Sequence, residues 1–115
     1  MIDFACKRFD LDDIIKCGLG LTKTEFKIMK FLLKNSNKKH TTNKISKKLN
    51  LNLTTIQKAV KKLSKLNIIK KSQKNLLKGG YIYIYKCNPK EEVRTNIKKI
   101  IRNWSNKVEE EIDKW

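Results

Sequence analysis

Apolar side chains recur at the spacings of an α-helix in four segments of the first two thirds of the chain. The first segment, residues 9–18, carries one apolar stripe and ends at a glycine. The second, residues 22–34, is apolar on more than one face, so we expect it to be the most buried helix. A third helix is predicted over residues 41–49. A fourth, residues 53–66, repeats apolar positions every three or four residues and leaves its polar side chains on the opposite face.

Residues at the boundaries of these segments support the helix assignment. Thr22 and Glu25 have the spacing of a capping box, and Leu21 with Phe26 has that of a hydrophobic staple. Asn50 stands between the third and fourth helices, and asparagine is one of the few residues other than glycine that accepts a left-handed backbone. The two helices should therefore be joined by a tight turn.

After the fourth helix the apolar period changes to that of a β-strand. Two strands are predicted, one beginning at residues 68–71 and one over residues 81–85, joined by a loop that contains lysines and glycines. Three tyrosines share one face of the second strand, and we expect Ile82 and Ile84 on the other face to point toward the core. Such a tyrosine face is more typical of packing on a helix than of stacking on single-stranded bases.

The C-terminal segment predicts a long helix with an apolar seam. Asn88 would cap it, with Pro89 in the first position and acidic residues in the first turn. The seam is longer than a small domain needs to cover its core, and such seams usually pack on a partner helix. We therefore expect a homodimer held by the first and last helices. The predicted interface residues are Leu11, Ile14, Ile15, Val93, Ile97, Ile100, Trp104, Val108 and Ile112.

The distribution of charge is more informative than the net charge of +17. Residues 26–90, here called the basic block, contain 18 lysines and neither Asp nor Glu, whereas residues 1–25 and 91–115 hold nearly equal numbers of basic and acidic side chains. A lysine-rich composition alone fits a solvated surface equally well. The exclusion of carboxylates from the middle of the chain indicates a polyanionic partner.

Length and composition favour one small intracellular domain. The 115 residues, 39% of them hydrophobic, suffice for one core. No stretch approaches the roughly 20 apolar residues of a membrane span, and the first ten residues are charged where a signal peptide is apolar. The three cysteines are odd in number and lack the CxxC spacing of a zinc site. We expect a cytoplasmic protein without membrane contact.

No arrangement of residues predicts catalysis. His40, the only histidine, lies in a lysine-rich loop without a nearby acid, and we expect it at the surface. Neither a metal-ligand cluster, nor a phosphate-binding glycine loop, nor a nucleophile elbow is present in the sequence. Cys17 could act as a redox sensor, but its apolar neighbours favour a buried, inert thiol. The sequence therefore predicts a protein that is not an enzyme and has neither cofactor nor metal.

Two short helices joined by a tight turn, the second with polar and basic groups at its start, are the arrangement of a helix-turn-helix. A helix fits the major groove, where glutamine suits adenine and lysine suits guanine, so Gln57 and Lys58 are predicted to contact bases. Thr54 and Thr55 would contact phosphates or base edges. The lysines predicted to hold the DNA backbone are Lys44, Lys47, Lys48, Lys61 and Lys62 and, on the hairpin, Lys74 and Lys78. Two simpler interpretations remain: an amphipathic helix with a solvated polar face, and a hairpin that is merely a solvated turn.

Residues 41–86 resemble the winged-helix core of MarR- and TrmB-like regulators of archaea and bacteria. These families show a helix of the type T-x-x-x-I-A-x-x-L, a turn, S-T-V-x-R-x-L-x-x-L, then G-L-I and a wing before a dimerisation helix. The matching positions here are Ile45, Leu49, Thr55, Ile56, Lys58, Val60, Leu63, Ile68 and Ile69. Asn50 and Asn67 stand where these families often have glycine, and asparagine can adopt the same backbone. The resemblance implies a dimer on a nearly palindromic operator, with the wing at the adjacent minor groove or backbone.

The sequence thus predicts a mainly α winged helix-turn-helix protein with a small β-hairpin wing. Residues 1–20 and 89–115 would form the dimerisation helices, and residues 21–88 the DNA-binding domain. The predicted function is sequence-specific binding of double-stranded DNA by a homodimer that regulates transcription. Two alternatives remain: an architectural DNA-binding protein without sequence preference, and a protein-interaction module whose basic block faces an acidic partner. The sequence indicates neither the effector nor the operator.

Overall fold

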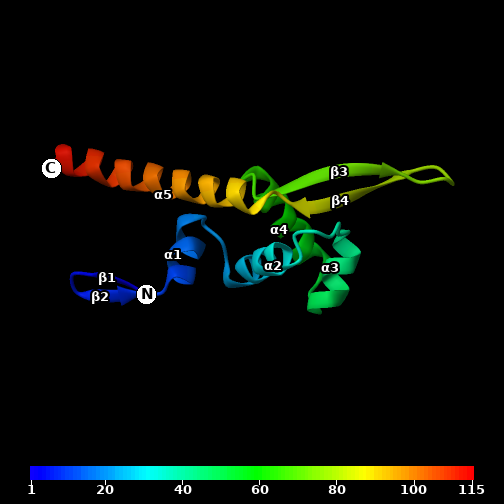
Figure 1. Cartoon of the computed structure of the whole chain (residues 1–115), viewed down its shortest axis with the longest axis horizontal. Coiled ribbons are helices and arrows are strands. Elements are labelled where there is room, and N and C mark those ends of the chain that lie inside the picture. The colour runs from blue at the N-terminus through cyan, green and yellow to red at the C-terminus, as the bar shows by residue number, and fades with distance from the viewer.

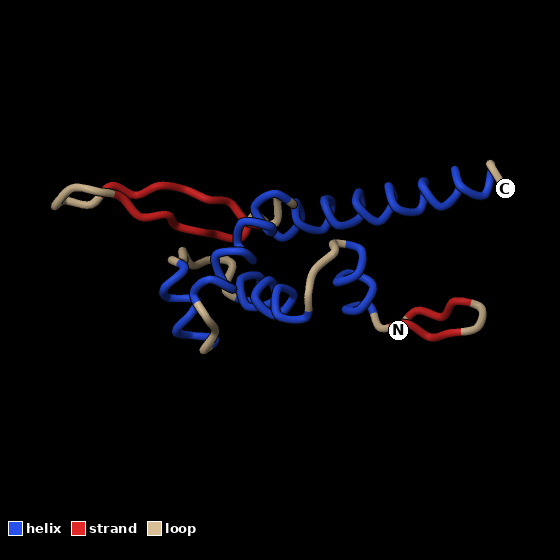
Figure 2. Tube along the Cα trace, turned by 180° about the vertical axis from the view of Figure 1, so that it is seen from behind, coloured by secondary structure: helices blue, strands red, loops and turns tan.

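The computed structural model describes all 115 residues, which form five helices and two antiparallel hairpins (Figure 1). The elements are β1 (Ile2–Phe4), β2 (Lys7–Phe9), α1 (Leu11–Gly18), α2 (Lys23–Lys34), α3 (Thr42–Leu49), α4 (Leu53–Lys65), β3 (Ile69–Asn75), β4 (Tyr81–Cys87) and α5 (Lys90–Asp113). The molecule measures 62 × 25 × 25 Å. It is elongated because the β3–β4 hairpin and α5 project from the body in opposite directions, as Figure 2 shows from behind.

The core lies between α2, α3, α4 and the base of the β3–β4 hairpin. The largest fully buried side chains are Ile28, Leu32, Ile45, Ile56, Leu63, Ile68 and Val60. Three buried residues come from α2 and four from α4, so these two helices share the centre of the molecule. Because α4 buries one face completely in this core, its polar face is held in a fixed direction.

The predicted caps of the central helices are confirmed. The Thr22 hydroxyl accepts a bond from the Glu25 N–H at 3.1 Å, and the Glu25 carboxylate accepts one from the Thr22 N–H at 2.8 Å. Asn50 has φ 53° and ψ 47°, the left-handed conformation expected between the two helices. The Asn52 side chain then caps α4 by accepting a bond from the Thr54 N–H at 2.8 Å. Helices α3 and α4 are therefore joined by a short, defined turn.

The β3–β4 hairpin enters the body only at its base. Its register runs from Ile69 opposite Cys87 to Asn75 opposite Tyr81, and near the base Ile69, Tyr85 and Cys87 are buried. The prediction that Ile82 and Ile84 face the core is wrong. Residues directly opposite each other share a face, so the core-facing side carries the tyrosines, while the two isoleucines lie on the other side of the hairpin.

The start of α5 also differs from the prediction. Its N-cap is Pro89 rather than Asn88, and no side chain caps it. The Asn88 side chain instead donates a hydrogen bond to the Asn67 carbonyl at 2.7 Å, and Asn96 donates to the same oxygen at 3.0 Å. The turn after α4, where Asn67 has φ 60°, is thus tied to the beginning of α5.

An N-terminal hairpin, β1–β2, precedes the first helix and was not predicted. Ile2 lies opposite Phe9, which places both on one face with Phe4. Asp3 and Arg8 form an ion pair of 2.8 Å across the other face. Strands of three residues are too short to produce a readable period, which explains why the sequence pattern missed them.

Two single-residue predictions of burial are wrong. His40 is only 3% exposed, because its backbone bridges to Tyr85 (N–H to O distances of 2.9 and 2.7 Å) and its ring packs against Phe31 at 5.4 Å. Cys17 is exposed, since α1 has no buried residue; Cys87 is the buried cysteine, and burial raises the pKa of its thiol.

The order of elements is that of a winged helix-turn-helix protein: α2, α3, the turn, α4 and then the β3–β4 hairpin, which is the wing. The predicted fold class is confirmed. None of the helices has the length and apolar character that crossing a membrane requires.

Candidate nucleic-acid interface

Helix α4 presents a polar face to solvent. Its buried positions are Ile56, Ala59, Val60 and Leu63. The predicted base-contacting residues Gln57 and Lys58 are exposed, as is Thr54 in the first turn, while Thr55 is half-buried. The side chains of Gln57 and Lys58 have no hydrogen-bond or ion-pair partner within the chain. The first turns of α4 therefore offer free amide, hydroxyl and ammonium groups on a rigid helix.

Helix α3 adds lysines beside this face. Lys44, Lys47 and Lys48 are all exposed, as predicted for contacts with the DNA backbone. The positive charge of this region acts on His40: burial lowers the pKa of His40 most, and the nearby charges of Lys44, Lys38 and Lys48 lower it further. Lys44 and Lys48 are four positions apart and therefore share one face of α3.

The wing carries the remaining predicted contacts. Lys74 on β3 and Lys78 in the connecting loop are exposed. Tyr81 and Tyr83, 54% and 40% exposed, pack edge to face at 5.3 Å, and the Lys71 ammonium lies 3.8 Å from the centre of the Tyr83 ring. These two tyrosines therefore do not pack on a helix, contrary to the expectation for the tyrosine face. Only the third tyrosine, at the base of the strand, is buried.

Few lysines of the basic block are neutralised. The block contributes two lysines to ion pairs, Lys30 with Asp12 at 2.6 Å and Lys62 with Glu25 at 3.2 Å, and both acids lie outside the block. The other lysines of α3, α4 and the wing have no acidic partner. This surface therefore has a strongly positive potential, which favours binding of a polyanion.

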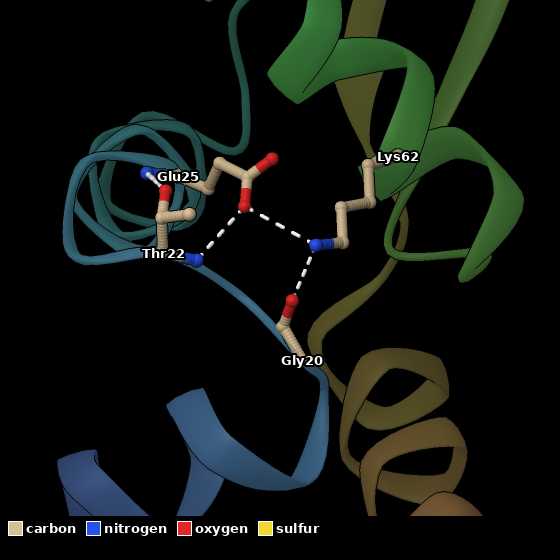
Figure 3. Close-up of polar contacts among 4 residues, drawn as sticks. All are labelled: Gly20, Thr22, Glu25 and Lys62. Carbon is tan, nitrogen blue, oxygen red and sulfur yellow. Dashed lines mark hydrogen bonds and ion pairs between the residues drawn. The ribbon is translucent and has the colours of Figure 1, made fainter.

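Lys62 differs from the other lysines of α4. Figure 3 shows its ammonium between the Gly20 carbonyl and the Glu25 carboxylate, both of which accept hydrogen bonds from it. Burial tends to raise the pKa of Glu25, but hydrogen bonds from the Thr22 N–H and from Lys62 outweigh this effect and hold the pKa below its usual value. The structure thus engages Lys62 with Glu25 of α2 and with the turn before α2. We correct the prediction accordingly and omit Lys62 from the candidate DNA contacts.

Several candidate contacts were not predicted. Lys65, Lys70, Lys71 and Lys86 are exposed members of the basic block on α4 and the wing. The sequence did not identify them as contacts, because helical periodicity shows which lysines face solvent but not which of these meet DNA. It also does not indicate which side of the wing faces outward. The wing tip also exposes two leucines, Leu76 and Leu77, which break the usual preference for polar residues in turns.

Helices α1 and α5 pack on each other within the chain. Val93 is 3% exposed and belongs to the core, so its predicted place in a dimer interface is wrong. Ile15, Ile97 and Ile100 are partly buried against the same core. From Arg102 onward every residue of α5 is exposed. The apolar seam of α5 therefore has two parts. The first part covers the core, and the second part belongs to the half of the helix that projects beyond the body (Figure 1).

Solved structures with a similar arrangement include proteins described as transcriptional regulators. A solved structure described as a possible transcriptional regulator from Methanosarcina mazei Go1 is 43% identical, covers 100% of this chain and 96% of its own, and superposes with a TM-score of 0.90. A mutant of MepR from S. aureus, bound to an oligodeoxyribonucleotide, has a TM-score of 0.56 over 84% of this chain and 70% of its own. Its identity of 13% shows a shared fold alone.

The sequence comparisons define the family more closely. The uncharacterized protein MJ1503 of Methanocaldococcus jannaschii is 31% identical over 108 residues, which are 94% of this chain and 80% of that protein. The family described as DnaD N-terminal domain matches residues 9–108. Membership of the MarR or TrmB group in particular stays a prediction, whereas the match over most of the chain shows that it belongs to the DnaD N-terminal domain family.

Proposed function

We propose that this protein is a transcription regulator that binds double-stranded DNA in a sequence-specific manner as a homodimer. The observation that carries the proposal is the solvent face of α4, where Thr54, Gln57 and Lys58 are free of partners on a helix flanked by unpaired lysines. A helix of this kind fits the major groove, and its first turns point side chains at base edges. The 43% identical archaeal protein described as a possible transcriptional regulator supports the same function.

Each group of residues has a distinct part in the proposed complex. Gln57 and Lys58 contact base edges, with the two threonines at phosphates or bases nearby. The lysines of α3, together with Lys61, hold the phosphates that flank the major groove. Lys74 and Lys78 of the wing hold the backbone at the adjacent minor groove. Two copies of α4 would enter successive major grooves about 34 Å apart.

The dimer in this proposal rests on the free half of α5. Its exposed apolar residues Trp104 (64%), Val108 (40%) and Ile112 (59%) recur every four positions on one stripe. The 14 residues from Arg102 to Trp115 make no buried contact within the chain, and a helix of that length is marginal alone in water. A second copy of the chain would cover the stripe. Residues 1–20 and 89–115 would thus form the dimer layer, and residues 21–88 the DNA-binding domain.

The charges of α5 favour an antiparallel pair. Residues 94–107 hold five basic side chains and no acid, whereas residues 108–113 hold four acids and no basic side chain. Antiparallel packing brings the basic segment of one copy to the acidic segment of the other, while parallel packing brings like charges together. The β1–β2 hairpin, one face of which carries Ile2, Phe4 and Phe9, lies at the same end of the molecule as the free half of α5 (Figures 1 and 2). This face, with Phe4 70% exposed, is available to the partner's helix.

Selection of bound fragments from a pool of random duplex DNA tests the proposed specificity. We expect a consensus with two related half-sites, and an affinity at least 10³-fold higher than for random duplex, roughly the lower end of specific recognition. A pool that binds without enrichment would support an architectural protein instead. Absence of DNA retardation at moderate salt would overturn the proposal in favour of a protein-interaction module.

Two lysine variants separate base contacts from backbone contacts. Lys58→Ala should change the selected consensus, because Lys58 faces base edges, whereas Lys78→Ala should weaken binding to every sequence alike. Lys23→Ala, which removes an exposed, unpaired charge at the start of α2 and outside the basic block, is the matched control and should change neither property. Equal losses on all sequences for Lys58→Ala and Lys78→Ala would refute the base-contacting role of Lys58.

A further inference from the structure

The tip of the wing exposes two adjacent leucines. Leu77 is 107% exposed and Leu76 is 44% exposed, at the end of the hairpin farthest from the body (Figure 1). Neither leucine belongs to the hydrophobic core or packs against it. Turn positions usually carry glycine, proline, asparagine, aspartate or serine, so a pair of large apolar side chains at this place serves no purpose in the isolated fold.

The turn holds these leucines in a defined position. The Leu76 N–H donates a hydrogen bond to the Gly80 carbonyl at 3.0 Å, and the Gly79 N–H donates to the Leu76 carbonyl at 3.1 Å. Gly79 and Gly80 have φ of 91° and 80°, which residues with a side chain adopt only at a cost. The antiparallel ladder behind the turn is continuous to the base of the wing. The tip is therefore a narrow turn with a defined conformation, supported by the strands behind it, rather than a loose loop.

The surroundings of the leucines are cationic. Lys74 and Lys78, both exposed, lie on either side of them in the sequence, and no carboxylate occurs anywhere in the basic block. An acidic or purely apolar protein groove would not need such uniform charge around two leucines. The combination of an apolar tip with cations on both sides fits the minor groove of DNA, where phosphates border a stack of apolar base faces.

We propose that the wing tip acts as an apolar wedge, an inference that rests on the proposed DNA binding. Leu77, together with Leu76, inserts between base steps of the minor groove and bends the duplex. Inserted leucines, isoleucines and phenylalanines partly unstack a base step and kink DNA by about 20–90° toward the major groove. Lys74 and Lys78 neutralise the phosphates on either side of the opened step. The wing then favours flexible pyrimidine–purine steps, which are the easiest to unstack, and so adds sequence preference outside the reach of α4.

The test measures bending separately from binding, with the full-length chain and a duplex of about 30 base pairs taken from the selected sequences and labelled at both ends for energy transfer. Fluorescence anisotropy gives the affinity, and energy transfer at saturating protein gives the bend. The native chain should increase energy transfer. The double variant Leu76→Ser/Leu77→Ser should still bind, with an affinity lowered by about tenfold, and should lose the increase.

Two further variants sharpen the result. Leu77→Phe keeps an apolar wedge and should keep the bend, whereas Lys78→Ala should weaken binding yet bend the duplex fully at saturation. Because Leu76 and Leu77 lie outside the hydrophobic core, their substitution should leave the circular dichroism spectrum and the melting temperature unchanged.

The possible outcomes separate the wedge from the proposed function. A double serine variant that bends DNA as the native chain does would overturn the wedge and leave DNA binding intact. Absence of any anisotropy change with native protein would overturn both proposals. Cosedimentation of the native chain with phosphatidylserine vesicles, lost in the double serine variant while bending is retained, would assign the tip to a membrane surface instead.

Discussion

Lys61 and Lys62 are adjacent and chemically identical, but their side chains differ in their contacts and therefore in their expected roles. Lys61 is exposed and has no partner, whereas the Lys62 ammonium contacts the Gly20 carbonyl and the Glu25 carboxylate. Substitution of each by methionine removes the charge and keeps most of the aliphatic stem. We expect Lys62→Met to destabilise the fold and Lys61→Met to weaken DNA binding.

The magnitude follows from the contacts of Lys62. A hydrogen bond to a charged group contributes about 1.5–3 kcal/mol to stability, but the side chains of Lys62 and Glu25 are 39% and 15% exposed, so solvent screens the pair. We therefore expect a coupling between Glu25 and Lys62 of about 1 kcal/mol. With the loss of the bond to Gly20, Lys62→Met should lower the free energy of unfolding by about 1–2 kcal/mol. Each 1 kcal/mol corresponds to about 4 °C in melting temperature for a domain of this size.

Urea unfolding and fluorescence anisotropy on the same protein samples distinguish the two roles. A double-mutant cycle of Glu25→Gln and Lys62→Met gives the coupling, and Lys61→Met serves as the control with equal loss of charge. Lys61→Met should leave stability within about 0.5 kcal/mol of the native value. If both methionine variants weaken DNA binding equally and neither changes stability, the assignment of Lys62 to fold stability and of Lys61 to DNA binding is wrong.

Three further predictions concern a buried histidine, a turn and the dimer. Burial lowers the pKa of His40 in the folded state from its ordinary 6.5. The neutral imidazole therefore contributes its full stabilisation above pH 6.5, and this stabilisation is lost as the pH falls through the lowered pKa of the folded state. His40→Phe should therefore lose less stability than the native chain between pH 7.5 and 5, as measured by urea unfolding, and an equal loss would contradict this reasoning. Asn50→Ala should cost about 1 kcal/mol in thermal unfolding because φ is 53°, whereas Asn50→Gly should keep the native stability. Trp104→Glu should convert a dimer into a folded monomer in sedimentation, and an unchanged dimer would remove the α5 stripe from the interface.

The central part of the fold was predictable because its signals are local. A capping box, a left-handed asparagine and an apolar stripe each depend on residues within one or two helical turns, so the sequence alone places α2, α3 and α4. The exposed state of Gln57 and Lys58 follows from the same periodicity. These residues of the candidate site could be identified without a structure.

The features that were missed depend on contacts between distant segments. His40 is buried because β4 bridges to its backbone 45 positions later in the chain, and Lys62 is engaged by a carboxylate 37 positions earlier. The face of β4 that meets the core was misjudged, because only the end of the strand enters the body and buried tyrosine and cysteine replace the expected isoleucines. Period-two patterns identify two faces but do not say which one is covered.

The salt dependence of duplex DNA affinity tests the central claim, that the acid-free surface of α3, α4 and the wing binds the phosphate backbone. Anisotropy titrations over about 50 to 300 mM salt should give a steep linear decrease of log affinity with log salt concentration. The slope should become shallower by about 2 when Lys47 and Lys61 are both replaced by methionine, and should stay unchanged when Lys23 and Lys27 of α2, both exposed and unpaired, are replaced instead. An absence of binding near 150 mM salt, or an equal change of slope in both double variants, would contradict the account.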